Sequence, residues 1–200
     1  MTRVKLEPIR EPTTFLVGPR WPWEDTGKVY VLACGNVPQH QLSRVAGTIR
    51  KLLKEFGVPL IVNVDPDMKH RKAITQVISQ TRQGRRLDNQ LLVTRINEER
   101  RTSQKLRTGL VILLNPLEFD CFERPGETQP GIYGTTHDDG VSLLLCYKDA
   151  VVRHEFAHML GLEQHHDEDP TCVMNWLCQS NIFCPSCANK LRSIVRIVDE

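Results

Sequence analysis

Residues 153–162 read RHEFAHMLGL, and no other segment of the chain carries so specific a pattern. His154 and His158 are four residues apart, so on a helix they project from the same side, about one turn apart. Two imidazoles placed in this way can reach one ion at a Zn–N distance of about 2 Å. Gly161 stands where such a helix must end, so the segment predicts a zinc-binding helix followed by a turn.

Glu155 directly follows the first histidine and can lie beside the open coordination position of the metal. There, a carboxylate can take a proton from zinc-bound water and deliver it to a leaving amine. Because Glu155 is not needed to hold zinc, its presence favours catalysis over a purely structural metal. Two histidines and a glutamate in this pattern predict a zinc metallopeptidase, a hydrolase in which Glu155 activates the zinc-bound water.

Further candidate groups follow the glycine. A third histidine just past Gly161, His165 or His166, would complete a three-histidine site with one position open for water. Met174 lies eight residues beyond His166 and can form the turn beneath the metal. Together with the helix, this order is the extended zincin pattern.

Four of the seven cysteines fall within the last thirty residues, which in a reduced protein favours metal binding over disulfides. Cys184 and Cys187 form a tight pair joined by a turn, and Cys172 and Cys178 can supply the other half of a tetrahedral thiolate site. Four thiolates leave no open position. The sequence therefore predicts a structural zinc that folds a tail too short to build its own core.

The length of 200 residues fits a single domain. Together with the motifs, it leads us to expect one catalytic domain over residues 1–200, with an N-terminal subdomain over residues 1–161 and a small C-terminal subdomain over residues 162–200. The formal net charge is only +2, and no apolar run approaches the roughly 18 to 20 residues of a membrane span. Residues 1–20 also lack the apolar run of a signal peptide. We therefore expect a cytoplasmic protein with no membrane partner.

Apolar periodicity predicts strands that alternate with helices. This order favours helices packed on a twisted, largely parallel sheet, with a long loop over residues 118–140. Helices are expected at residues 39–56 and 69–81, and strands are expected at residues 29–34, 60–64, 90–96, 110–114 and 141–147.

Residues 69–107 carry eleven Lys or Arg and three acids, a local net charge of +8. A nucleic-acid face is one interpretation of such a segment. However, basic and apolar residues alternate there at helix and strand periods, and no aromatic residue interleaves for base stacking. A solvated face is therefore preferred, and a nucleic-acid partner is not expected.

The motifs together resemble the archaemetzincin family. Its pattern runs His-Glu-x-x-His-x-x-Gly-x-x-His-Cys, then four residues, Cys-x-Met and later Cys-x-x-Cys. The resemblance is strong over residues 153–191. The matching positions are His154, Glu155, His158, Gly161, Cys172, Met174, Cys184 and Cys187.

Two positions depart from that pattern. Gln164 occupies the place of the third histidine, whereas counting back from Met174 puts the third ligand at His166, which we prefer to the alternative His165. Asp167 stands where a cysteine is expected, and Cys178 could take that place in the ligand set. The metal ligands implied in this way are His154, His158, His166, Cys172, Cys178, Cys184 and Cys187.

The resemblance implies an α+β, minimal metzincin (zincin-like) fold, with a twisted mixed sheet, packed helices, an active-site helix and a small zinc-stabilised C-terminal region. It implies one catalytic and one structural zinc, although imidazoles suit other first-row metals too. A strand within residues 133–145 would border the cleft and bind an extended peptide substrate. The rival interpretation is a non-catalytic, zinc-stabilised binding protein with a protein or nucleic-acid partner.

Overall fold

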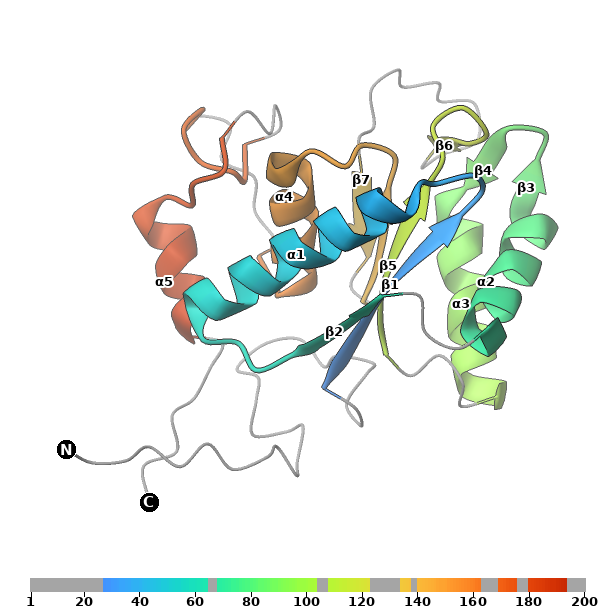
Figure 1. Cartoon of the computed structure of the whole chain (residues 1–200), viewed down its shortest axis with the longest axis horizontal. Coiled ribbons are helices and arrows are strands. Elements are labelled where there is room, and N and C mark those ends of the chain that lie inside the picture. Colours follow the sequence, from blue (N-terminus) through green and yellow to red (C-terminus); the bar gives the residue numbers. More distant parts are fainter. Residues whose placement is uncertain are drawn as a thin grey trace.

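The computed structural model describes residues 27–64, 68–103, 108–122, 134–137, 140–162, 169–175 and 180–193. A mixed five-stranded sheet lies between two helical layers (Figure 1). Its strand order is β2-β1-β5-β8-β7, with β7 antiparallel to β8 and the other neighbours parallel. The strands are β1 (Lys28–Cys34), β2 (Ile61–Val64), β5 (Gly109–Leu114), β7 (Gly134–His137) and β8 (Val141–Leu144).

The central strand β5 shows how the sheet builds two cores. All six of its residues are buried, and successive side chains alternate between the faces of the sheet. Val111 and Leu113 join the core on the side of the zinc-motif helix, while Leu110, Ile112 and Leu114 join the opposite core. A continuous apolar strand is therefore what a sheet covered on both faces requires.

One face of the sheet is covered by α1 (Gln39–Phe56), α4 (Asp149–Met159) and α5 (Pro185–Ser193) (Figure 1). The helix expected at residues 39–56 is confirmed, and it ends at Gly57, whose φ of 69° lies in the left-handed region. Residues 172–174 and α5 share one core with α1 and α4. The proposed division of the chain at residue 161 stays a prediction.

The opposite face is covered by α2 (Met68–Thr81) and α3 (Asn89–Ser103) (Figure 1). The strand expected at residues 90–96 is wrong, because this segment lies inside α3. Asp88 Oδ1 accepts the backbone N–H of Leu91 at 2.9 Å, as a residue that caps a helix does. Leu92, Val93 and Ile96 then fall on one helical face and are buried.

A second, three-stranded sheet was not expected from the sequence. Its order is β3-β4-β6, formed by β3 (Arg82–Gln83), β4 (Arg86–Asp88) and β6 (Asp120–Phe122). The expectation of one long loop over residues 118–140 is thus wrong at two places, because both β6 and β7 lie within it. The three strands of this sheet have only two or three residues each, and β6 pairs with β4 from a distant part of the sequence, so local patterning gives them little signal.

Among the residues that the structure describes, no helix combines the length and the hydropathy needed to cross a bilayer.

Candidate metal centre

The motif helix α4 follows strand β8 closely and contacts both β7 and β8. Asp149 lies in its first turn and accepts hydrogen bonds from Arg44 Nε at 3.2 Å and Thr48 Oγ1 at 3.1 Å, which join α4 to α1. Gly161, at a φ of 93°, ends the helical path, and the N–H of Leu162 bonds the carbonyl of Ala157 at 3.0 Å. This turn places the Leu162 carbonyl beside the last turn of the helix.

The two histidine rings of α4 lie next to each other, with their planes at 76° and their Nε2 atoms directed at one another. Their Nε2 atoms are 3.1 Å apart. Each Nδ1 atom faces a backbone carbonyl: His154 Nδ1 lies 2.8 Å from Val173 O, and His158 Nδ1 lies 2.5 Å from Leu162 O. Because a carbonyl oxygen only accepts hydrogen bonds, both Nδ1 atoms carry the hydrogen, and each Nε2 of a neutral ring presents a lone pair.

These two lone pairs fit a cation. Lone pairs that face one another at this distance repel unless a proton or a metal ion lies between them. Two nitrogens that are each about 2.0–2.1 Å from a tetrahedral zinc stand about 3.3 Å apart. The 3.1 Å between His154 and His158 is close to that span. A metal-binding histidine usually donates the N–H of its other ring nitrogen to a carbonyl, a carboxylate or water, as the Nδ1 atoms of both histidines do here. The two histidines therefore suit zinc.

Glu155 projects from α4 onto the edge strand β7. The Thr136 hydroxyl donates to Glu155 Oε2 at 2.7 Å, and Glu155 is only 7% exposed. A Cβ added to Gly134 would stand 2.7 Å from Glu155 Cγ, closer than real Cβ contacts allow. Gly134 and Thr136 lie two residues apart and so face the same side of β7. Neither residue was predicted from the sequence, because no motif around them indicates a contact with Glu155.

Three of the four expected cysteine ligands lie close together and form a second candidate metal site. The Sγ atoms of Cys172, Cys184 and Cys187 all lie within 4.8 Å of one another. Two of these residues are buried, and Cys184 is partly buried. The backbone N–H of Cys184 lies 3.3 Å from Cys172 Sγ. Thiols gathered in this way suit a soft, thiolate-preferring ion such as zinc.

The thiols of this cluster differ in acidity. Burial acts to raise the pKa of Cys184, but hydrogen bonds from the backbone of Cys187 and Ser186 and from the neighbouring thiols lower its pKa overall. Burial, followed by the contacts with Cys184 and Cys172, raises the pKa of Cys187 well above its usual range. Cys184 therefore loses its proton more readily than Cys187, and the positive charge of a bound cation would stabilise the thiolate form of both residues.

The two candidate sites share one short segment. Val173 directly follows Cys172, and its carbonyl faces the His154 ring. The Val173 N–H donates to the Ile182 carbonyl at 2.6 Å, and a turn closes from Asn175 N–H to Cys172 O at 3.0 Å. Met174, the expected turn methionine, lies inside this turn and is fully buried.

Other predicted ligands fall in segments that the structure does not describe. His165, His166 and Asp167 lie within residues 163–168, and Cys178 lies within residues 176–179. The choice between the two histidines, and between Asp167 and Cys178, therefore stays a prediction. The roles assigned to the described residues also stay predictions, although the structure brings them together in two groups.

Several arginines of the basic segment 69–107 contact other parts of the chain, the exposed Arg82 and Arg85 at the surface and Arg100 in a buried position. Arg82 donates to the Glu118 carbonyl at 3.0 Å and lies over the Phe119 ring. Arg85 pairs with Asp120 at 3.2 Å, and Arg100 donates to the Thr108 carbonyl at 2.8 Å. These contacts stabilise the second sheet and the end of α3, so this share of the positive charge has a structural use.

No protein-family model matches the chain, and no curated protein matches it by sequence. Among solved structures, the crystal structure of archaemetzincin from Methanopyrus kandleri is similar, with a TM-score of 0.55 at 19% sequence identity. The match covers 84% of this chain and 94% of that chain. At this identity the likeness shows the fold. The chain has an archaemetzincin-like α+β fold, as the motifs predicted.

Proposed function

We propose that this protein is a zinc-dependent peptidase whose metal is held by His154 and His158, with His166 as the third ligand. The observation that carries the proposal is the pair of Nε2 atoms 3.1 Å apart, with both Nδ1 atoms facing carbonyls. A proton shared between the two Nε2 atoms would also remove their repulsion, but it would give Glu155 no role. The glutamate lies one residue from His154, and its carboxylate is held against the edge strand β7.

Zinc bound between the histidines would lower the pKa of a water and polarise the scissile carbonyl. Glu155 would accept the proton of the attacking water and deliver it to the leaving amine. Within the described residues, β7 ends the larger sheet, so an extended peptide can pair with its outer edge beside Glu155. The reaction class is thus hydrolysis of a peptide bond in an extended substrate.

The cysteine cluster would hold a second, structural zinc, with Cys178 completing Cys172, Cys184 and Cys187. Its use would be to fix residues 172–174, since this segment carries the carbonyl that faces His154. One catalytic and one structural ion per chain is therefore the expected metal content. The two ions would have different exchange behaviour, because a closed thiolate shell leaves no open position.

The first experiment measures zinc per chain by mass spectrometry for the wild type and His158→Ala. Two zincs that fall to one would support separate histidine and cysteine sites. One zinc that His158→Ala leaves unchanged would contradict the histidine site. The protein would then be better described as a zinc-stabilised binding protein.

The second experiment measures cleavage of a peptide library by the zinc-loaded wild type and by Glu155→Gln. General acid–base catalysis contributes about 10²–10⁴-fold, so the variant should lose at least 100-fold of the wild-type rate while keeping both zincs. Glu98→Gln is the matched control, because this glutamate lies on the exposed side of α3 and pairs with Arg95. Cleavage by Glu155→Gln at the wild-type rate would refute the proposed chemistry.

A further inference from the structure

Two hydroxyl side chains on neighbouring strands form a chain of contacts that ends at the Glu155 carboxylate. Thr136 on β7 stands directly opposite Ser142 on β8 in the sheet register. The two hydroxyl oxygens are 3.1 Å apart, and Thr136 Oγ1 lies 2.7 Å from Glu155 Oε2. Ser142 is 1% exposed, whereas Thr136 is partly buried, so the inner end of this pair is shielded from water. The arrangement links the sheet to the one acidic side chain of the zinc motif.

The direction of these hydrogen bonds follows from the number of protons. Thr136 has one hydroxyl hydrogen but three acceptors within reach: Glu155 Oε2 at 2.7 Å, the Glu155 carbonyl at 3.0 Å and Ser142 Oγ at 3.1 Å. A carboxylate is the strongest acceptor of the three and is also the nearest. The Thr136 hydrogen therefore goes to Oε2, and the Ser142 hydroxyl can then donate to Thr136 Oγ1.

We propose that Thr136 is a positioning residue for the Glu155 carboxylate, and that Ser142 orients the Thr136 hydroxyl toward it. The inference rests on the proposed peptidase function, and it identifies how the general base is held. Held at Oε2, the carboxylate keeps its plane fixed, so that its other oxygen keeps its direction while a proton is taken up and passed on. Gly134 leaves the space that this carboxylate needs, because a Cβ there would stand 3.0 Å from Glu155 Oε1.

A held carboxylate matters to the rate because a misplacement of about 1 Å in a catalytic group can cost about 100-fold. Without the Thr136 hydrogen bond, the Glu155 side chain has several rotamers open to it. Loss of the hydroxyl should therefore lower kcat, which depends on the carboxylate, more than KM. A role limited to packing would instead follow the size of the side chain.

The test compares Thr136→Val with Thr136→Ser in zinc-loaded protein. Valine keeps the shape and removes the hydroxyl, whereas serine keeps the hydroxyl. We expect kcat to fall about 10- to 100-fold in Thr136→Val with KM changed less than about 2-fold, and we expect Thr136→Ser to stay within about 3-fold of the wild type. Ser142→Ala should give a smaller fall. Thr81→Val is the matched control, since this buried threonine bonds carbonyls within α2.

A second readout does not need activity. The Tm of metal-free Thr136→Val, Glu155→Ala and the double variant is measured, and the double variant should lose less than the two single losses together, because either single change already removes the hydrogen bond. Zinc content should stay at the wild-type value in Thr136→Val. An active wild type with an unchanged kcat in Thr136→Val would overturn the inference and leave the peptidase standing. A zinc-loaded wild type that cleaves no peptide would overturn the peptidase and, with it, the catalytic role of Thr136.

Discussion

The Nδ1 atom of His154 lies 2.8 Å from the carbonyl oxygen of Val173, which directly follows Cys172. A predicted ligand of the histidine site is therefore oriented by the neighbour of a predicted ligand of the cysteine site. The Val173 N–H is itself bonded to Ile182, two residues before Cys184. The backbone around Val173 thus connects the two candidate metal sites. A change that disorders one site should therefore weaken metal binding at the other.

Disrupting the cysteine site should weaken metal binding by the histidines. Cys187→Ser removes one thiol of the cluster and frees the segment that carries Val173, so the His154 ring loses its fixed partner. Changes to such outer contacts typically cost about 10- to 100-fold in metal affinity. Zinc affinity of the remaining site, measured by competition with a chelator, should fall by that factor. Cys34→Ser serves as control, and an unchanged affinity in Cys187→Ser would show the two sites to be independent.

A methyl group at residue 134 should impair catalysis and leave zinc in place. In Gly134→Ala the new Cβ would stand 2.7 Å from Glu155 Cγ, so the carboxylate or β7 must move. We expect cleavage to fall at least 10-fold with unchanged zinc content. Gly47→Ala is the matched control, because a Cβ there meets nothing within 4 Å. In the interior of α1 it should instead stabilise the protein by about 0.5–1 kcal/mol.

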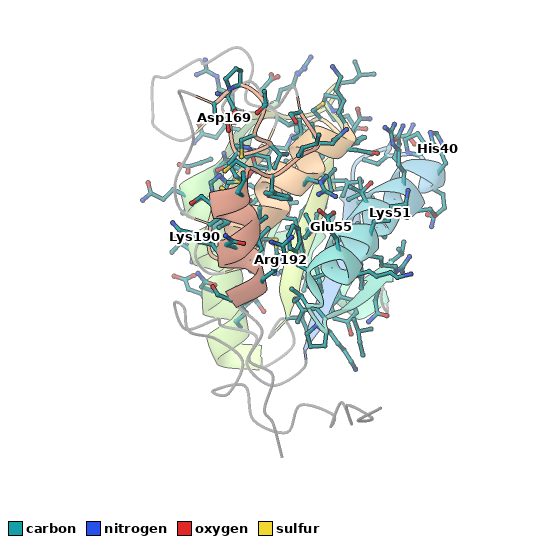
Figure 2. All side chains as sticks on the ribbon, turned by 90° about the vertical axis from the view of Figure 1, so that its left-hand side faces the viewer. His40, Lys51, Glu55, Asp169, Lys190 and Arg192 are labelled. Carbon is teal, nitrogen blue, oxygen red and sulfur yellow. The ribbon has the colours of Figure 1, made fainter. Side chains whose placement is uncertain are left out.

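Two arginines that join α1 and α4 should differ in their contribution to stability. Arg153 pairs with Glu55 at 2.8 Å, lies over the Phe183 ring and is 11% exposed in its side chain, whereas the side chain of Arg44, paired with Asp149, is 53% exposed. Figure 2 shows Glu55 on α1 beside α5. Arg153→Ala should cost about 2 kcal/mol through lost cation–π contact and packing.

The matched change Arg44→Ala should cost less than about 1 kcal/mol, because exposed ion pairs are weak. Urea unfolding of the two variants measures the difference. Equal losses would mean that the aromatic contact at Phe183 adds nothing.

Stability should fall at alkaline pH because of Tyr147. Burial, and then the nearby Cys146, raises the pKa of Tyr147 to about 12, and its hydroxyl donates to the Leu114 carbonyl at 2.5 Å. The folded state thus favours the neutral phenol, whereas the unfolded chain ionises near about pH 10. The stabilisation is complete below pH 10 and is lost as the pH rises through 12. Unfolding of the wild type and Tyr147→Phe should therefore differ most at pH 9, and a constant difference up to pH 12 would contradict this account.

Local spacing along the chain predicted the elements that carry the candidate metal ligands. Helix geometry alone places two histidines that are four residues apart on the same side of α4, and Gly161 predicts where this helix ends. The close spacing of Cys184 and Cys187 predicted a thiol pair in the same way, and the apolar run at residues 110–114 predicted a strand, which the structure shows to be buried on both faces. These features depend on covalent geometry and short-range periodicity, which the sequence contains directly.

Tertiary structure alone decided how those elements are supported. The segment 90–96 has an apolar pattern that suits a strand or a helix, and the Asp88 cap together with burial under the sheet makes it a segment of α3. Thr136 meets Glu155, and Val173 meets His154, each across nineteen residues of sequence. Such pairs are set by the register of β7 against β8 and by the path of the chain after α4. Their energies arise only when distant segments pack, so no local pattern predicts them.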